Sequence, residues 1–345
     1  MKHLLSAQPA EKVQVALESS CVWEVILGIA GYTYAQLRHS FDLDEQWKDW
    51  KGEMNSSLID HLKQIQETNL WYGMLLLQNR WNADTLQEFS NKLQNMTEEE
   101  FYETLLPYKN REAEATRKEN ALNFSHENRF REYAAYFEGH EYLEGYVRLL
   151  GERPRVELSS LMLSAMEEWH GFISAKPVWE KWMQSLAHET RQTMKFEEPL
   201  EEIERITGGL KYIPEPSVWY IKLVPHVSYR PWVLQLRTPD TMLFFYPVNE
   251  EYFTEPGVPS MDLIRGHKAL GDEFRLKLLF QLQKGPLSLQ ELSGQFHMSK
   301  TTLHHQLSLL KAAKFVSVEK GIYSANVKQI QSFSERLIQY LGKEG

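Results

Sequence analysis

Apolar residues recur at three- and four-residue spacing through residues 1–210. This spacing places them on one face of a helix and is typical of amphipathic helices. Thr97 followed by Glu100 has the form of a capping box and predicts that a helix begins there. The charged stretch Lys109–Glu127 is compatible with a helix that has a solvated face or with a connecting loop. We therefore expect a helical N-terminal domain.

Near Pro214 the pattern changes to short runs rich in β-branched and aromatic residues, separated by turns that contain proline. These runs are Ser217–Val224, Trp232–Arg237 and Thr241–Val248. They predict a small three-stranded antiparallel sheet over residues 211–250, whose last two strands form a hairpin around Pro239-Asp240. We expect this sheet to close the N-terminal domain. Residues 251–260 include two prolines and a glycine and predict a linker.

Residues 261–345 carry clear signals for the start and end of helices. Asp272, Ser288 and Ser299 can each cap a helix, and Gly285-Pro286 ends one. The expected elements are helices over Met261–Leu270, Asp272–Lys284, Leu289–Gln295, Ser299–Ala312 and Lys328–Leu341, and a hairpin of Phe315–Glu319 with Ile322–Asn326. This order is typical of a winged helix-turn-helix domain, in which the fourth helix is the recognition helix.

The expected recognition helix has an apolar face formed by Leu303, Leu307 and Leu310. Its other side has hydrogen-bonding and cationic groups and no carboxylate. Thr and His side chains can reach base edges in the major groove, whereas Lys and Ser can hold phosphates. Lys320 at the hairpin tip is also well placed for a phosphate. We therefore predict that DNA is bound by Ser299, Lys300, Thr301, Thr302, His304, His305, Ser308, Lys311 and Lys320.

The net charge of -9 hides an asymmetry between the two parts of the chain. Residues 262–345 contain twelve Lys and Arg and seven Asp and Glu, a net charge of +5, which leaves -14 on the preceding residues. A basic segment joined to an acidic body indicates nucleic acid at the basic end. The acidic body should be repelled by phosphate, so we do not expect it to lie along the duplex.

The segment that begins at Lys268 reads KALGDEFRLKLLFQLQKGPLSLQELSGQFHMSKTTLHHQLSLLKAAKFV. It resembles the ArsR-type winged-helix regulators in its Ala-Leu-Gly-Asp start, its Gly-Pro-Leu-Ser entry to the third helix and its Met-Ser-Lys-Thr-Thr-Leu-His-His turn. The resemblance implies homodimers on palindromic operators, with derepression when an effector is sensed. The third helix lacks the cysteines of the metal-sensing members. The preceding part, mainly through PWVLQLRTPDTMLFFYPV, resembles the helical domain found before this winged helix in some regulators.

The sequence predicts no metal site, no cofactor and no enzymatic activity. His304 and His305 are adjacent and would diverge on a helix, with His297 before it, so metal binding is not expected. His188-Glu189 lacks the second histidine of a zinc-protease motif, and the chain has no phosphate-binding glycine loop. No apolar run approaches the ~20 residues that span a bilayer. The single cysteine, Cys21, fits a reducing cytoplasm.

These observations predict a mainly α protein with a small antiparallel β element, in which a helical N-terminal domain precedes a C-terminal winged helix-turn-helix domain. We expect a cytoplasmic transcriptional regulator, a repressor that binds an operator in double-stranded DNA as a homodimer. The N-terminal domain would sense an unknown small-molecule effector or set the geometry of the dimer. Alternatively, it is a protein-interaction module that recruits a partner to DNA and binds no small molecule.

Overall fold

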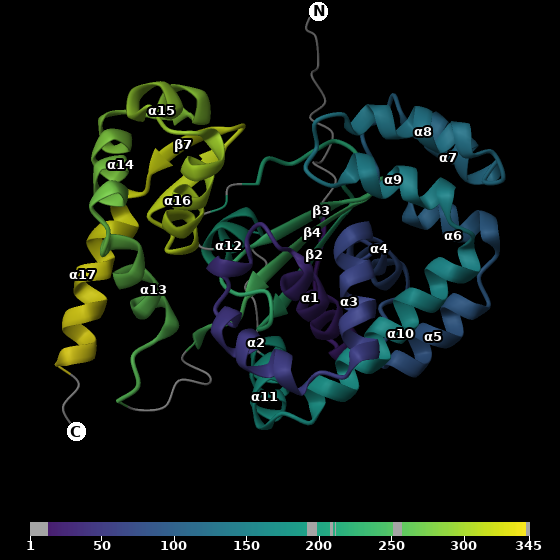
Figure 1. The fold of residues 1–345 in the computed structure, drawn as a ribbon, viewed down its shortest axis with the longest axis horizontal. Coiled ribbons are helices and arrows are strands. Elements are labelled where there is room, and N and C mark those ends of the chain that lie inside the picture. Colours follow the sequence, from purple (N-terminus) through teal and green to yellow (C-terminus); the bar gives the residue numbers. More distant parts are fainter. Residues whose placement is uncertain (1–12, 192–198, 208–209, 211, 251–256, 343–345) are drawn as a thin grey trace, which may run out of the picture. The chain divides into compact units, whose positions relative to one another are not determined.

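The computed structural model describes residues 13–191, 199–207, 210, 212–250 and 257–342. The chain is mainly α-helical and contains a small antiparallel β element near its C-terminus (Figure 1). It divides into two compact units. The first consists of residues 1–33, 54–228 and 233–247, and the second of residues 34–53, 229–232 and 248–345. The second unit therefore combines the C-terminal region with two segments that are distant in sequence.

The first unit is built mainly from helices that pack around α1 (Cys21–Thr33). Almost every residue of α1 is buried, which is expected of a helix that is apolar all round. Thr97 and Glu100 form the predicted capping box, and the stretch Lys109–Glu127 contains a helix. The other helices are α3 (Ser56–Thr68), α4 (Trp71–Trp81), α5 (Leu86–Gln94), α6 (Glu98–Leu105), α7 (Glu114–Leu122), α8 (Glu127–Ala134), η3 (Ala135–Phe137), α9 (Leu143–Glu152), α10 (Arg155–Ser174), α11 (Pro177–Arg191) and α12 (Pro199–Ile206).

The sheet of the first unit has four strands in the order β1-β2-β4-β3, and its pairing differs from the prediction. The strands are β1 (Gln14–Leu17), β2 (Tyr220–His226), β3 (Leu234–Arg237) and β4 (Thr241–Pro247). The hairpin of β3 and β4 is confirmed. The expectation of antiparallel pairing throughout is wrong, because β2 is parallel to both β4 and β1. β4 is buried on both faces and lies between the parallel strand β2 and the antiparallel strand β3, as expected of a central strand covered on both sides.

Alternate residues of β4 pack against helices on opposite faces of this sheet. Phe245 contacts Trp23 of α1, with ring centroids 5.3 Å apart. Phe244 and Tyr246 point to the other face, where they belong to a cluster that contains Ile203 of α12. Successive side chains of a strand point to opposite faces of the sheet, so neighbouring aromatic residues pack into two different hydrophobic cores.

The second unit contains the predicted winged helix-turn-helix elements. They are α13 (Met261–Leu270), α14 (Glu273–Lys284), β5 (Leu287–Ser288), α15 (Leu289–Phe296), α16 (Lys300–Ala312), β6 (Val316–Glu319), β7 (Ile322–Ala325) and α17 (Val327–Leu341). The three strands form an antiparallel sheet in the order β5-β7-β6. Most of the expected linker, residues 251–256, lies outside the described residues.

Local signals fix the ends of these helices. Asp272 caps α14, Ser288 and Glu291 form a capping box on α15, and Ser299 caps α16, as predicted. Leucines from four helices then close one core, which includes Leu278, Leu292, Leu303, Leu307, Leu310, Phe315 and Phe333. This core seats α16 by its leucine face and leaves the polar side of its N-terminal half exposed.

Replacing Gly266 with alanine should destabilise the winged helix, because a Cβ at this position would overlap the ring of Phe333. Gly266 is buried in α13, and the ring belongs to α17 and is itself 5% exposed. Overpacking of this kind costs about 1–3 kcal/mol. Chemical denaturation should show this loss for Gly266→Ala. Gly294→Ala on α15 is the matched control, since its Cβ would meet nothing within 4 Å, and it should be neutral or slightly stabilising. Equal stability of the two variants would contradict the close packing of α13 on α17.

Candidate nucleic-acid interface

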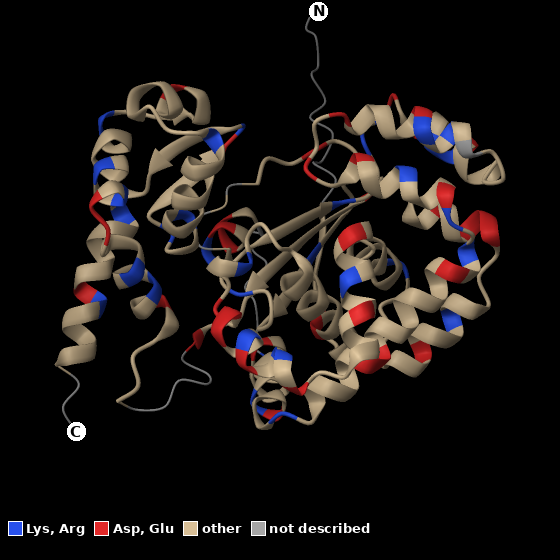
Figure 2. Ribbon diagram, viewed as in Figure 1, with Lys and Arg blue, Asp and Glu red and all other residues tan. Residues whose placement is uncertain are grey.

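The first turn of α16 is organised by its cap. The Ser299 hydroxyl accepts a hydrogen bond from the Thr302 backbone amide at 3.1 Å, and the two hydroxyl oxygens lie 2.8 Å apart. The remaining backbone amides at the start of the helix contribute partial positive charge, which favours a phosphate. No Asp or Glu occurs within α16 (Figure 2). The helix therefore presents a start that is suited to a polyanion.

Six of the nine predicted DNA-binding residues lie close together and exposed along the N-terminal half of α16. They are Ser299, Lys300, Thr301, Thr302, His304 and His305. Their arrangement places three hydroxyl groups, one ammonium group and two imidazole rings on the side opposite the buried leucines. This half of a recognition helix is the part that usually contacts base edges.

The C-terminal half of α16 is covered by residues that the sequence analysis did not consider. The His39 ring lies against that of His305, with centroids 4.0 Å apart and planes tilted by 37°, and His39 Nε2 lies 3.1 Å from Ser308 Oγ. Ser308 is only 3% exposed. Lys311 is half-buried, with its Nζ 5.3 Å from the centroid of the Trp232 ring. Of the nine predicted residues, Ser308 and Lys311 are thus engaged within the protein, and His305, although exposed, contacts the His39 ring.

The wing carries the ninth predicted residue at its tip. Lys320 is exposed, and both Lys320 and Gly321 have positive φ angles, 50° and 79°. Two consecutive left-handed residues are typical of the tight turn that matches the twist of a hairpin. The turn holds the Lys320 ammonium group away from the domain core, where it can approach a phosphate.

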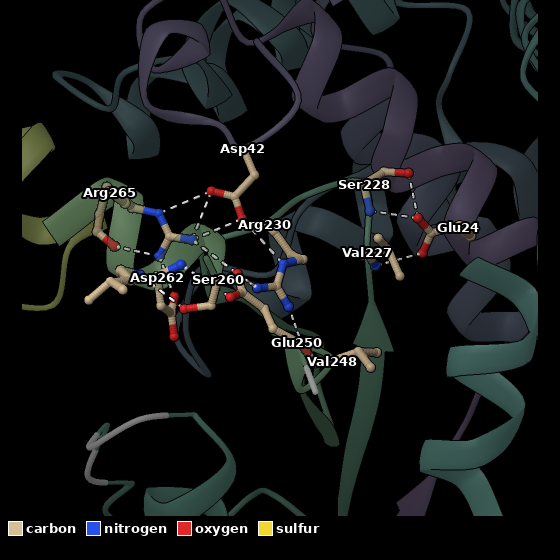
Figure 3. A network of polar contacts seen from close by, with 12 residues as sticks. Glu24, Asp42, Val227, Ser228, Arg230, Val248, Glu250, Ser260, Asp262 and Arg265 are labelled. Atoms are coloured by element: carbon tan, nitrogen blue, oxygen red, sulfur yellow. Dashed lines mark hydrogen bonds and ion pairs between the residues drawn. The ribbon is translucent and has the colours of Figure 1, made fainter. Parts of the chain in front are cut away.

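A buried ion-pair network joins residues 34–53 and 229–232 to the winged helix (Figure 3). Arg265 of α13 donates to both carboxylate oxygens of Asp42, at 3.0 and 2.9 Å. Arg230 donates to Asp42 at 3.2 Å and also pairs with Glu250. Arg265 further donates to Asp262 at 2.6 Å. Two arginines therefore share three carboxylates, of which Asp42 and Glu250 are buried and Asp262 is partly exposed.

The same network reaches the end of the recognition helix. Arg265 Nη1 donates to the carbonyl oxygen of Ala312 at 3.2 Å, where the partial negative charge of the α16 dipole favours a cation. Burial would raise the pKa of Asp262, but the nearby cations, Arg265 foremost, lower it to about 2. Burial raises the pKa of Glu250 despite its arginine neighbours. Arg265 thus connects α13, α16 and residues 34–53 through charged contacts.

The residues missed by the sequence analysis are His39, Asp42, Trp232 and Arg265. Each looks like an ordinary surface or core residue in its local context, and its partner lies far away in the chain. His39 and Ser308, for example, are 269 positions apart. No periodicity or cap signal could have brought them together.

Other kinds of site find little support in the described part of the chain. No group of three or more His, Cys, Asp or Glu side chains there is arranged to hold a metal ion. Within the same ranges, every helix is too short or too polar to cross a membrane.

Comparisons with known proteins agree with the assignment of α14, α15 and α16 to a helix-turn-helix. The profile of the family described as bacterial regulatory protein, arsR family, matches residues 272–318. The transcriptional repressor SdpR of Bacillus subtilis (strain 168) is 30% identical over 80 residues, which are 22% of this chain and 89% of that protein. No solved structure matches the chain. Through its winged helix-turn-helix domain, the chain belongs to the arsR family of bacterial regulatory proteins, the DNA-binding regulators of transcription.

Proposed function

We propose that this protein is a sequence-specific repressor that places α16 in the major groove of its operator. The observation that carries this proposal is the exposed, carboxylate-free N-terminal half of α16, seated on the domain core by Leu303 and Leu307. Thr301 and His304 would contact base edges, and Lys300 and Lys320 would hold phosphates. The repressor role is supported by the similarity to SdpR, the transcriptional repressor of Bacillus subtilis.

The protein would act as a homodimer that pairs through α17. Ile338 and Leu341 lie three residues apart on this helix and are 70% and 67% exposed, so together they offer an apolar surface that a second copy could cover. A two-fold dimer would place two copies of α16 in successive major grooves about one helical turn apart. Replacing both residues with glutamate should yield a monomer in analytical ultracentrifugation.

The first unit would sense a small effector, and a cavity supports this role. The cavity has a volume of about 440 Å³ and is lined by charged and aromatic side chains that include Arg80, Glu103, Tyr108, Arg117 and Lys222. This lining favours a polar effector. An effector regulates only if it binds the DNA-competent and DNA-incompetent arrangements with different affinity. Recruitment of a protein partner by this unit is the alternative, and it predicts DNA binding that no small molecule changes.

Genome-wide mapping of bound DNA tests the proposal. It should return a limited set of sites that share a roughly palindromic sequence. Uniform coverage of the genome, or no enrichment, would contradict sequence-specific binding. The genes next to the sites would also suggest the chemistry of the effector.

Operator affinity should fall steeply with salt, because each phosphate contact releases condensed counterions. Lys320→Ala should weaken binding on all sequences and reduce the slope of log affinity against log salt by about 0.9, the value for one phosphate contact. Fluorescence anisotropy at several salt concentrations measures this slope. An unchanged slope would show that Lys320 does not contact a phosphate.

A further inference from the structure

We propose that residues 34–53 and 229–232, here called the cover, form an intramolecular brake that lies on α16 from His305 to Lys311 and weakens DNA binding until it is released. This inference rests on the proposed function of α16. It adds a regulatory site at the recognition helix, formed by residues far from it in sequence.

The cover occupies space that a duplex would need. It contains η1 (Arg38–Ser40), α2 (Asp44–Trp50) and η2 (Lys51–Glu53). The His39 ring lies on His305, and the Trp232 ring lies against the Lys311 ammonium group. A recognition helix in a major groove is flanked by both sugar-phosphate backbones. The cover packs along α16 and would therefore collide with one of these two backbones.

The charge of the cover, like its position on α16, disfavours DNA binding. The cover contains five acidic and four basic side chains, a net charge of -1. Among the exposed side chains of this segment, three acids outnumber the two lysines: Glu45, Asp49 and Glu53 against Lys48 and Lys51. A negative segment beside the recognition helix repels phosphate, so the cover is suited to inhibit DNA binding and poorly suited to extend the interface.

The cover is held in place by specific ring contacts, a hydrogen bond and an ion pair. Phe41 packs edge-on against Tyr229, with ring centroids 4.9 Å apart, and Trp232 Nε1 donates to Ser40 Oγ at 3.0 Å. The bidentate contact of Asp42 with Arg265 fastens it to α13. These contacts hold the cover in one defined arrangement on α16. A brake needs such an arrangement, because it must switch between a bound and a released state.

The chain connects the cover directly to the first unit. The cover begins one residue after α1 ends at Thr33. Its second part follows Ser228, whose backbone amide donates at 2.6 Å to the buried carboxylate of Glu24 on α1 (Figure 3). A rearrangement of α1, for example on binding an effector, would therefore pull on both parts of the cover at once.

Acid should favour release. Burial lowers the pKa of His39, and the neighbouring His305, His304 and Lys48 lower it further against the opposing effect of Asp44. A histidine whose pKa is lowered in the covered state binds protons more tightly when released. The covered state is therefore most stable above the ordinary pKa of about 6.5 and loses stability as the pH falls below it.

The test uses the full-length protein. One variant weakens the contact of the cover with α16, and a second locks that contact. His39→Ala/Trp232→Ala removes the two ring contacts on α16 and should strengthen binding to a fluorescent random-sequence duplex by about threefold to tenfold. This gain should shrink as the pH is lowered below about 6.5. The matched control is His170→Ala/Trp179→Ala, which removes a similar ring pair in the first unit, with centroids 5.6 Å apart, and should leave DNA affinity unchanged.

The second arm locks the cover and does not depend on the first variant folding. His39→Cys/His305→Cys in a Cys21→Ser background is joined by a short bismaleimide and compared with the same protein whose thiols are blocked singly. The joined form should bind the duplex at least about tenfold more weakly.

The outcomes separate the two proposals. If the wild type binds DNA and neither the ring variant nor the joined form differs from its control, the brake is wrong and the DNA-binding function stands. If neither the wild type nor the ring variant binds duplex DNA, the proposed function fails and the brake fails with it.

Discussion

Replacing Arg265 with alanine is expected to lower the free energy of unfolding of the second unit by about 3–5 kcal/mol, the range for removing one partner of a buried ion pair. Arg265 is 9% exposed and holds Asp42, Asp262 and the Ala312 carbonyl oxygen. Without its guanidinium group, the Asp42 carboxylate stays buried with one arginine in place of two. Urea denaturation followed by circular dichroism measures the change.

The control for this prediction is an ion pair in the same unit that is exposed. Lys277 pairs with Glu273 at 2.6 Å, with side chains 61% and 83% exposed. Lys277→Ala should change the stability by less than about 1 kcal/mol, since solvent screens such pairs. A similarly small effect of Arg265→Ala would show that the network contributes little to folding.

Replacing His304 with alanine should weaken operator binding by about 1–3 kcal/mol, which is roughly 5- to 150-fold, while binding to random duplex changes little. His304 is exposed in the second turn of α16, where an imidazole ring can reach a base edge. A base contact is lost only on the correct sequence, so the ratio of specific to random binding should fall.

Lys300→Ala provides the contrast on the same helix. Its ammonium group is exposed in the first turn and would contact phosphate on any sequence. This variant should weaken operator and random duplex alike. If His304→Ala also weakened both equally, base readout by His304 would be contradicted. Both variants change exposed side chains, so their thermal midpoints should match that of the wild type.

The winged helix could be predicted from sequence because its signals are local. The caps at Asp272, Ser288 and Ser299, and the glycine before Pro286, set the helix ends within one or two residues. The spacing of the leucines then determined which face of α16 is buried. The exposed half of the predicted interface follows from these signals alone.

The sheet of the first unit and the cover could not be predicted, since each depends on contacts between distant residues. β1 is four residues long and has no turn signal that identifies its partner, which lies some 200 residues later. Asp42 looks like a surface carboxylate until Arg230 and Arg265 are placed beside it. Ser308 lies on the polar face of α16 by its spacing, and only the tertiary position of His39 buries it.

The most direct test of the account adds carboxylates to the open half of α16. Lys300→Glu/Thr301→Glu changes two exposed residues in the first turn, where acidic side chains stabilise a helix and repel phosphate. The matched control, Lys328→Glu/Gln329→Glu, makes the same charge change in the first turn of α17. In a titration of fluorescent operator, the α16 variant should lose at least about 100-fold in affinity without losing thermal stability, whereas the control should bind nearly as the wild type. Wild-type affinity of a folded Lys300→Glu/Thr301→Glu protein would contradict the claim that α16 is the surface that binds DNA.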